Sequence, residues 1–473
     1  MRILGFAFIL LALVGCESGP KLPNLSQIYD NAAMTESQDR RPVITIPGLL
    51  GSRLVDRGSG TVVWGDETRL SLDPSDPVAT RLIALPIGDG LTPLKQQMDD
   101  IRPRGVLRTA KTSVLGVPVS LDIYGGIVRT LIAGGFDFRL TRKEEIEERN
   151  VNLDSFEFPY DWRRGVVEAA QDLDYFIKRK KKQVAAARRD TFGDATKPVK
   201  FDIIAHSMGG LVARYYLMYG AAELPEDGSL PPLTWAGAKN VDRVIYVAPP
   251  NAGSARTAMS LVNGRSLGFL QPNYRPGLIA THISTYQLLP RNRHHRVTIV
   301  DEAKPVDLYD IETWDRLGWG LLDPREDELL EILLPEATDR ATRRTIARAH
   351  VAQMLERADH LHRAMDRKVE QPPGLEAFLV VGGGEPTLSN VSFDKDRHEM
   401  IETAWGEGDG VVLRASSLLD ERQGGVYTLN LRTPLSFQSI LLLPEEHLAI
   451  TQSPVFGDNV LFWLLEAPRN EDL

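Results

Sequence analysis

Ser207 is the residue best placed to act as a nucleophile. It lies in the segment Ala-His-Ser-Met-Gly-Gly at positions 205–210, after an apolar run at 201–205 and before a helical pattern at 211–219. The apolar run is typical of a buried strand, and a sharp turn from strand to helix exposes a serine hydroxyl above the sheet. Ala205 replaces the first glycine of the usual G-x-S-x-G pattern. The pattern favours a nucleophilic Ser207, and the alternative is an ordinary turn rich in serine and glycine.

A glycine-bearing turn near the start of the chain is suited to a second part of such a site. Residues 41–47 read as a short apolar strand, which runs into Gly-Leu-Leu-Gly-Ser at 48–52. In α/β hydrolases a turn of this kind donates one backbone N–H to the oxyanion, and the residue after the nucleophile donates the other. That rule predicts Leu49 and Met208 as oxyanion donors through the main chain. The alternative is a plain strand and turn with no such role.

Four short motifs follow one another along the chain. They are Pro-Gly-Leu-Leu-Gly at 47–51, Pro-Tyr-Asp-Trp-Arg at 159–163, His-Ser-Met-Gly-Gly at 206–210 and Gly-Asp-Gly-Val-Val at 408–412. This set resembles the P-G-x-x-G, P-Y-D-W-R, H-S-x-G-G and G-D-G-T-V motifs of the lecithin:cholesterol acyltransferase family, and Gly-Glu-Pro-Thr at 384–387 resembles its weaker G-x-P-T signature. The resemblance extends over most of the chain, and it implies an α/β-hydrolase fold and lipid acyl transfer.

The resemblance also implies that Asp409, in the fourth motif, is the catalytic acid. His447 follows it, and the order Ser207, Asp409, His447 is that of α/β hydrolases. Among the nine histidines, His206 is adjacent to the serine along the backbone and His398 precedes the acid. A serine hydroxyl is a weak nucleophile until an imidazole takes its proton, and a buried carboxylate holds that ring in the required tautomer. We therefore predict Ser207, Asp409 and His447 as the catalytic residues.

Two positions beside Asp409 depart from the family motif. Val411 stands where the family has threonine and Leu413 where it has proline, which leaves the acyl acceptor open between water and an alcohol or sterol. The paired cysteines of the secreted animal members are also missing, so any lid is not closed by a disulfide. Asp161 precedes a helical pattern, and we interpret it as a structural residue that caps this helix rather than as a catalytic acid.

Strands and helices alternate along most of the chain, which predicts a mostly parallel, doubly wound α/β sheet. Residues 255–373 break this rhythm with long charged helices and an aromatic cluster of Tyr309, Trp314 and Trp319. We interpret them as a helical cap that covers the serine and forms an acyl-chain groove, although ordinary helical core is the better interpretation of any single cap residue. The predicted division is a hydrolase core at 41–254, the cap at 255–373 and a second part of the core at 374–473.

No metal and no other cofactor is expected. The cap region carries His294, His295, His360 and His362, but these have no cysteine partners, and their carboxylate neighbours are typical of charged helices. Trp64 follows a loop and is a candidate for the site entrance, although a lone tryptophan is more often a packing residue.

The N-terminus predicts export. Residues 1–16 hold one arginine, an apolar stretch too short to span a bilayer, and a final Leu-Val-Gly-Cys. This segment resembles a bacterial lipoprotein signal in which Cys16 carries the lipid, and the alternative is an ordinary secretory signal that ends near Gly15. Cys16 is the only cysteine, so no disulfide can form within the chain. Residues 17–40 read as a flexible tether, and we expect a lipid anchor to hold the protein to a membrane surface of the cell envelope.

Composition and charge set the class of protein. The chain of 473 residues is 42% hydrophobic and 25% charged, which is typical of a globular protein with a large core. Its net charge of −9 argues against a nucleic-acid partner. The residues favour a serine-dependent lipid acyl hydrolase or O-acyltransferase that acts on phospholipid or related acyl esters through an acyl-enzyme. The alternatives are a short-chain or carbohydrate esterase of the cell envelope, and a lipoprotein that binds a lipid or partner on this scaffold without turnover.

Overall fold

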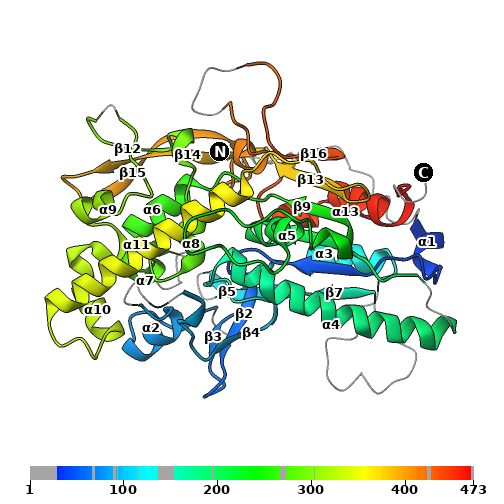
Figure 1. The fold of residues 1–473 in the computed structure, drawn as a ribbon, viewed down its shortest axis with the longest axis horizontal. Helices are drawn as coiled ribbons and strands as arrows, with labels where there is room; N and C mark the ends of the chain where they lie inside the picture. Colours follow the sequence, from blue (N-terminus) through cyan, green and yellow to red (C-terminus); the bar gives the residue numbers. More distant parts are fainter. Residues whose placement is uncertain are drawn as a thin grey trace, which may run out of the picture.

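One parallel sheet forms the centre of the computed structural model, which describes residues 29–66, 70–88, 92, 94–114, 117–136, 154–193, 197–266, 273–302, 304–422 and 428–469. The sheet has the strand order β16-β13-β9-β8-β1-β7 (Figure 1). Its strands are β1 (Val43–Ile46), β7 (Ser155–Glu157), β8 (Phe201–His206), β9 (Val241–Val247), β13 (Glu376–Gly382) and β16 (Ser439–Leu443). Every neighbouring pair in this sheet runs parallel, which confirms the predicted α/β class.

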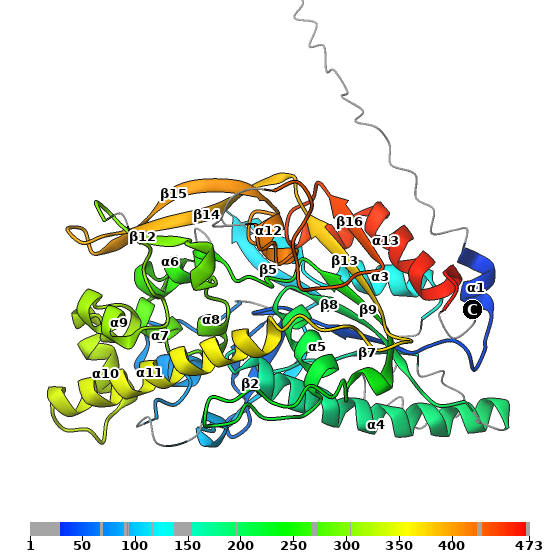
Figure 2. The same ribbon diagram turned by 45° about the horizontal axis from the view of Figure 1, so that its top comes forward.

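Helices cover both faces of the sheet. Ile203 of β8 packs in one apolar cluster with α4 (Val166–Phe192) and α5 (Met208–Tyr219). Ile204, the next residue, packs in a second cluster with α3 (Gly125–Ala133) and α13 (Pro454–Leu461). Successive side chains of a strand point to opposite faces, so this alternation places one pair of helices on each side of the sheet (Figure 2). Burial on both faces explains why these strands read as continuous apolar runs.

A group of helices lies beyond one end of the central sheet, at the left of Figure 1. The chain between β9 and β13 forms it, with α6 (Ala255–Asn263), α7 (Pro276–Ile279), α8 (Ile283–Gln287), α9 (Ile311–Leu317), α10 (Asp327–Leu333) and α11 (Arg340–Met365). The long helix α11 packs against α8, α9 and α10. These helices occupy the segment predicted as a cap, and the boundaries of that cap stay a prediction.

The chain after β13 leaves the central sheet before it returns. β14 (Glu385–Asp394) and β15 (Glu399–Gly408) form a long antiparallel hairpin, and β12 (Val297–Ile299) pairs with β14 in parallel. The hairpin also packs on α6. It therefore joins the helical group to the second part of the chain, and β16 then completes one edge of the central sheet.

Smaller elements connect the sheet to the helical group. β2 (Ser52–Asp56), β3 (Val62–Trp64) and β4 (Ile101–Val106) form an antiparallel sheet, β5 (Thr109–Val114) pairs with β6 (Val117–Asp122), and β10 (Arg265–Ser266) pairs with β11 (Asn273–Tyr274). The remaining helices are α1 (Asp30–Met34), α2 (Pro77–Ile83) and α12 (Arg414–Ser417). α2 contacts both β3 and α10, so it links the strands that follow the turn at Gly48–Gly51 to the outer helices.

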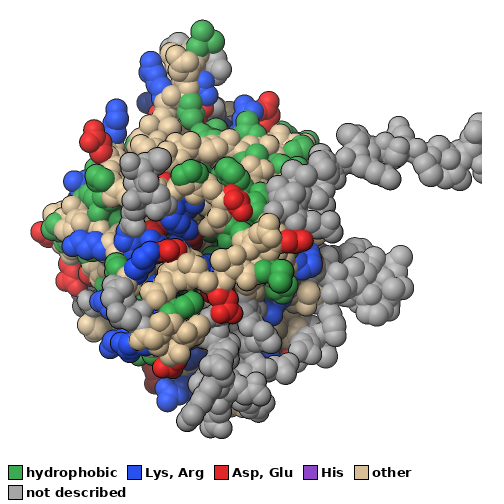
Figure 3. Space-filling view, turned by 90° about the vertical axis from the view of Figure 1, so that its right-hand side faces the viewer, with side chains coloured by type: hydrophobic (Ala, Val, Ile, Leu, Met, Phe, Trp, Pro, Cys, Tyr) green, Lys and Arg blue, Asp and Glu red, His purple; other side chains and the backbone are tan. Residues whose placement is uncertain are grey.

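The predicted signal at 1–16, with Cys16, lies outside the described residues. Within the predicted tether the structure shows α1, and the hydroxyl of Tyr29 beside it donates to the Asp458 carbonyl oxygen at 3.0 Å. On the face beside α1 and the C-terminus, Figure 3 shows Lys and Arg side chains interspersed with acidic and apolar ones. Among the helices that the structure describes, none is long and apolar enough to cross a bilayer.

Candidate active site

Ser207 lies on the sharp turn between β8 and α5. Its backbone has φ 54° and ψ −128°, a conformation that a residue with a side chain rarely adopts. The turn is crowded, because a Cβ at Gly209 would lie 2.4 Å from the carbonyl oxygen of Pro47, and a Cβ at Gly48 would lie 2.7 Å from the Cβ of Ser207. Both positions therefore need glycine. The strained backbone is the geometry that exposes a serine hydroxyl at the end of a sheet.

The structure brings Ser207, Asp409 and His447 together from three separate segments. His447 Nε2 lies 3.0 Å from Ser207 Oγ, and His447 Nδ1 lies 2.7 Å from Asp409 Oδ2. The backbone N–H of His447 also donates to the carbonyl oxygen of Asp409 at 2.9 Å. Asp409 and His447 are both buried. The two loops that carry them are thus bonded to each other through main chain and side chain.

The surroundings of Asp409 favour its ionised form. Burial alone would raise its pKa, but the His447 ring and the N–H groups of Val412 and Val411, which both donate to Oδ1, hold the pKa of Asp409 below its usual value. The carboxylate accepts a hydrogen bond from Nδ1–H of His447. The neutral ring then presents the lone pair of Nε2 to the Ser207 hydroxyl, which is the arrangement in which imidazole can take the serine proton.

The two predicted oxyanion donors flank Ser207. Met208 is the first residue of α5, where a backbone N–H has no acceptor within its own helix. Leu49 lies in the turn that Gly51 closes by donating its N–H to the Gly48 carbonyl oxygen at 3.1 Å. In the described part of the chain, neither amide donates to a backbone acceptor. Their position is compatible with binding an oxyanion, and that role stays a prediction.

Tyr124 and His206 connect the turn at Gly48–Gly51 to the His447 loop, and the sequence alone predicted neither connection. The Tyr124 oxygen accepts from Gly48 N–H at 2.6 Å and lies 3.0 Å from His206 Nδ1. His206 Nε2 lies 2.9 Å from the carbonyl oxygen of His447. Burial, reinforced by the neighbouring His447, lowers the pKa of His206 to about 3. The neutral ring therefore donates from Nε2 and accepts at Nδ1, and the hydrogen bonds form a continuous chain.

A cavity adjoins the turn that holds Leu49 and Leu50. It has about 540 Å³ of empty space, part of it open to solvent. Its apolar lining is Leu49, Leu50, Trp64, Trp162, Ile279 and Leu288, and its polar lining is Thr257, Ser260, Arg265, Tyr274, His282 and Thr285. Trp64, the candidate for the site entrance, packs edge-on against Trp162 with ring centroids 5.4 Å apart. The cavity thus lies between the first strands and the helical group, next to the turn that holds Leu49.

The aromatic cluster of the cap lies elsewhere, in the interior of the helical group. Trp314 and Trp319 are each 1% exposed, and their ring centroids are 5.6 Å apart. The Tyr309 hydroxyl donates to the Pro290 carbonyl oxygen at 3.0 Å. Trp314 and Trp319 are therefore helical core, which is the alternative interpretation given for single cap residues, and the expectation that these two rings line an acyl-chain groove is wrong. Tyr309 is half-buried beside them.

Two of the cap histidines, His360 and His362, bind backbone carbonyl groups. His362 Nε2 lies 2.8 Å from the Gln287 carbonyl oxygen, and His360 Nε2 lies 2.6 Å from that of Ser229. Burial, with the nearby charge of Arg291, lowers the pKa of His362 to about 3, so its ring is neutral. In the residues that the structure describes, no three His, Cys, Asp or Glu side chains are grouped to hold a metal ion.

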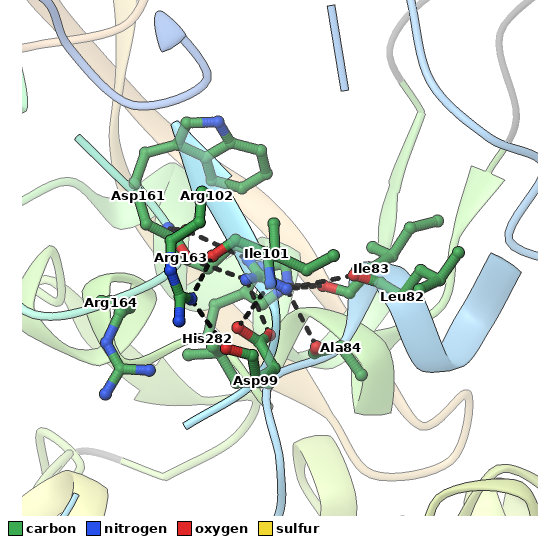
Figure 4. A network of polar contacts seen from close by, with 12 residues as sticks. Leu82, Ile83, Ala84, Asp99, Ile101, Arg102, Asp161, Arg163, Arg164 and His282 are labelled. Carbon is green, nitrogen blue, oxygen red and sulfur yellow. Dashed lines mark hydrogen bonds and ion pairs between the residues drawn. The ribbon is translucent and has the colours of Figure 1, made fainter. Parts of the chain in front are cut away.

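Asp161 is a structural residue, but it does not cap a helix. α4 begins after Gly165, whose N–H donates to the Glu168 carboxylate at 2.6 Å. Asp161 instead accepts from the Arg163 guanidinium at 2.7 Å, and Asp99 accepts from the same group at 2.8 Å (Figure 4). The guanidinium also donates to three carbonyl oxygens at the end of α2, those of Leu82, Ile83 and Ala84. The predicted cap is therefore wrong, and this buried ion pair ties the P-Y-D-W-R segment to α2.

Comparisons with known proteins agree with this architecture. The protein-family model for lecithin:cholesterol acyltransferase matches residues 147–316. The resemblance to this family is confirmed. The match includes the P-Y-D-W-R segment and the turn at Ser207, and it ends before Asp409 and His447.

One solved structure has a similar fold. The crystal structure of the Tle4-Tli4 complex matches 91% of this chain and 100% of that chain at 13% identity, with a TM-score of 0.53. The structure of EstA from Clostridium botulinum matches 92% of this chain and 90% of that chain at 11% identity, with a TM-score of 0.35. No curated protein matches the chain. The chain therefore has the α/β-hydrolase fold and resembles the lecithin:cholesterol acyltransferase family.

Proposed function

We propose that this protein is a serine-dependent lipid acyl hydrolase that can also transfer the acyl group to an alcohol. The family match and the hydrolase fold support a lipid acyl hydrolase or acyltransferase in general. The observation that carries the serine mechanism is the 3.0 Å separation of His447 Nε2 and Ser207 Oγ, with Asp409 Oδ2 2.7 Å from the other ring nitrogen. Acyl transfer through a covalent intermediate requires a nucleophile, a base and an orienting carboxylate in this arrangement.

The reaction forms and then breaks an ester of Ser207. As Oγ attacks the substrate carbonyl carbon, its proton passes to His447 Nε2, and the Leu49 and Met208 N–H groups stabilise the oxyanion. The bond to the leaving alcohol breaks, and His447 returns the proton to that alcohol. In the second step His447 takes a proton from water or an acceptor alcohol as its oxygen attacks the acyl-enzyme, and Ser207 leaves with that proton. Asp409 stays ionised and stabilises the imidazolium.

The cavity beside Leu49 supports a substrate with an acyl chain. Its wall contains Leu50, Trp64, Ile279 and Leu288, next to the turn that we assign to the oxyanion. A hydrocarbon chain gains about 25 cal/mol for each Å² that it buries against such a surface. This gain favours an ester that carries a hydrocarbon chain.

We also propose that a lipid on Cys16 anchors the protein at the cell envelope. The support is in the sequence, where the apolar segment ends in Leu-Val-Gly-Cys and a polar stretch follows. An anchored enzyme meets lipid substrates at a surface rather than in solution. The acyl acceptor then depends on how well water is excluded from the acyl-enzyme. We expect hydrolysis to dominate in dilute solution and transfer to increase as a long-chain alcohol or sterol is added.

Lipid profiling tests this function. The protein, incubated with mixed phospholipids, should release free fatty acid, and added long-chain alcohol should appear as new ester. Ser207→Ala should release no fatty acid above background, and Asp409→Asn should lower kcat by about a thousand-fold or more.

Two outcomes would contradict the lipid assignment. Turnover of short-chain or carbohydrate esters without cleavage of phospholipid would make the protein an esterase of that kind. Binding of lipid without turnover of any ester would exclude an enzymatic function and favour a lipid-binding protein.

A further inference from the structure

Arg265 is a cation with no counter-ion among the described residues of the cavity beside the turn at Gly48–Gly51. It lies on β10 and lines the same cavity as Leu49. Within the described part of the chain, its guanidinium has no ion-pair or hydrogen-bond partner. None of the described residues that line the cavity is Asp or Glu. The described wall of this cavity therefore carries a positive charge with nothing to balance it.

The surroundings make this unpaired charge unfavourable. Burial lowers the pKa of Arg265, and the positive charge of Arg256 lowers it further. A guanidinium still keeps its proton at neutral pH, because its ordinary pKa is so high. Two like charges repel each other, and Arg265 is half-buried, so solvent compensates its charge only in part. An anion bound beside Arg265 would offset both effects.

Other arginines near the cavity have carboxylate partners. Arg275, just after β11, lies 2.8 Å from the Glu326 carboxylate, and Arg163 lies 2.7 Å from that of Asp161. Arg256, in the first turn of α6, has no such partner among the described carboxylates. Arg275 and Arg163 are thus paired with carboxylates, whereas Arg265 and Arg256 are paired with none that the structure describes.

The cavity wall also holds hydroxyl groups that suit phosphate. Thr257 on α6 and Thr285 on α8 line it together with Arg265. Guanidinium and hydroxyl groups are common donors to phosphate oxygens. Leu49 belongs to the same wall. One molecule can therefore place an ester carbonyl at the oxyanion turn and a phosphate near Arg265.

We propose that Arg265, supported by Arg256, forms an anion-binding subsite that selects acyl esters carrying a negatively charged phosphate. This inference rests on the proposed function, because it concerns which ester reaches Ser207. A phospholipid with a net negative headgroup pairs with Arg265 and offsets the nearby charge of Arg256. A neutral diacylglycerol leaves Arg265 without an anion, and a zwitterionic lipid brings an ammonium group toward its positive charge.

The test compares lipids that differ in their headgroup. Phosphatidylglycerol, phosphatidylcholine and diacylglycerol with the same acyl chains are each diluted in micelles of one non-ionic detergent, so that the surface is the same. We expect the wild-type kcat/KM to be highest for phosphatidylglycerol. Arg265→Gln should lower that value by about 10- to 100-fold, the loss typical of a charge-assisted hydrogen bond, and should change diacylglycerol turnover by less than about twofold. Arg265→Lys should retain part of the preference, because it keeps the charge.

Arg316→Gln is the matched control. Arg316 is an exposed arginine of α9, and its loss should leave the order of the three substrates unchanged. Equal kcat/KM for phosphatidylglycerol and diacylglycerol in the wild type would overturn the proposal without any variant. An equal loss of kcat/KM for phosphatidylglycerol in Arg265→Gln and Arg316→Gln would overturn it as well.

A neutral short-chain ester separates this proposal from the proposed function. p-Nitrophenyl butyrate should be hydrolysed by the wild type, and inorganic phosphate should inhibit that reaction less in Arg265→Gln than in the wild type. Inhibition by phosphate without a preference for phosphatidylglycerol would assign the subsite to free phosphate and overturn the lipid selectivity. Turnover that persists in Ser207→Ala would contradict the serine mechanism, whereas normal turnover without any charge preference would contradict only the subsite.

Discussion

Replacing Tyr124 with phenylalanine removes one hydroxyl from the centre of the site. That oxygen accepts from Gly48 N–H at 2.6 Å, and its proton is donated to His206 Nδ1 at 3.0 Å. Tyr124 is 2% exposed and His206 is 1% exposed, so water has little access to replace these bonds. The variant therefore leaves one buried donor and one buried acceptor without a partner.

The expected loss of stability follows from these two unpaired groups. A buried polar group left unpaired costs about 1–3 kcal/mol, so Tyr124→Phe should lower the free energy of unfolding by about 2–6 kcal/mol. Gly48 has little room to relax, because even a Cβ there would lie 2.7 Å from the Ser207 Cβ. We expect kcat to fall by about 10-fold, less than when an oxyanion donor is removed outright. KM should change little, because the cavity wall is untouched.

Tyr160→Phe is the matched control for this variant. Tyr160 is 1% exposed, and its hydroxyl donates to the Pro47 carbonyl oxygen at 3.0 Å, one residue before Gly48. Removal of the Tyr160 hydroxyl leaves only the Pro47 carbonyl oxygen unpaired. Urea denaturation should give about half the loss of stability seen for Tyr124→Phe, and kcat on a neutral ester should stay near the wild-type value. An equal fall in kcat for both variants would refute the idea that the chain of hydrogen bonds through His206 positions the turn.

Two further predictions concern stability and location. Asp366→Asn should lower the free energy of unfolding by about 3–5 kcal/mol in a urea titration, because the carboxylate lies 2.8 Å from Arg291 and 2.9 Å from Arg293. Burial alone would raise the pKa of Asp366, but Arg291, Arg214 and Arg293 hold it well below 3.8, so the stabilisation is complete above pH 3.8 and is lost as the pH falls toward the folded-state pKa. The free energy of unfolding of Asp366→Asn should therefore not show the fall at acid pH that titration of Asp366 causes in the wild type. Cys16→Ser should move the protein from the membrane fraction to a soluble or uncleaved form, and identical lipid-free fractionation of both proteins would contradict the anchor.

The central sheet could be predicted because its strands have a composition that only two-sided burial explains. The apolar run at 201–205 corresponds to β8, and the run at 41–47 contains β1. Both strands lie inside the sheet, with helices on both faces. The glycines around Ser207 were equally informative, since the close contacts at Gly48 and Gly209 exclude a side chain. Local composition therefore predicted the sheet and the turn that it supports.

Contacts between distant segments could not be predicted in this way. Tyr124 is 76 positions from Gly48 and 82 from His206, and nothing beside it in the sequence marks it for either contact. Asp161 was misread because an acidic residue before a helix suits capping as well as an ion pair, and only the fold shows that Arg163 turns toward it. The pairing of β12 with β14 was not predicted, because the two strands are separated by more than 80 residues and β12 lies within the predicted cap.

Covalent labelling tests the central claim most directly. A fluorophosphonate reacts with a serine that a neighbouring base has made nucleophilic, and mass spectrometry of the digested protein identifies the labelled residue. We expect a single label at Ser207 in the wild type and a labelling rate about a thousand-fold lower in His447→Ala. A label on another serine, or undiminished labelling of Ser207 in the His447 variant, would contradict the assignment of Ser207 as a nucleophile that His447 activates.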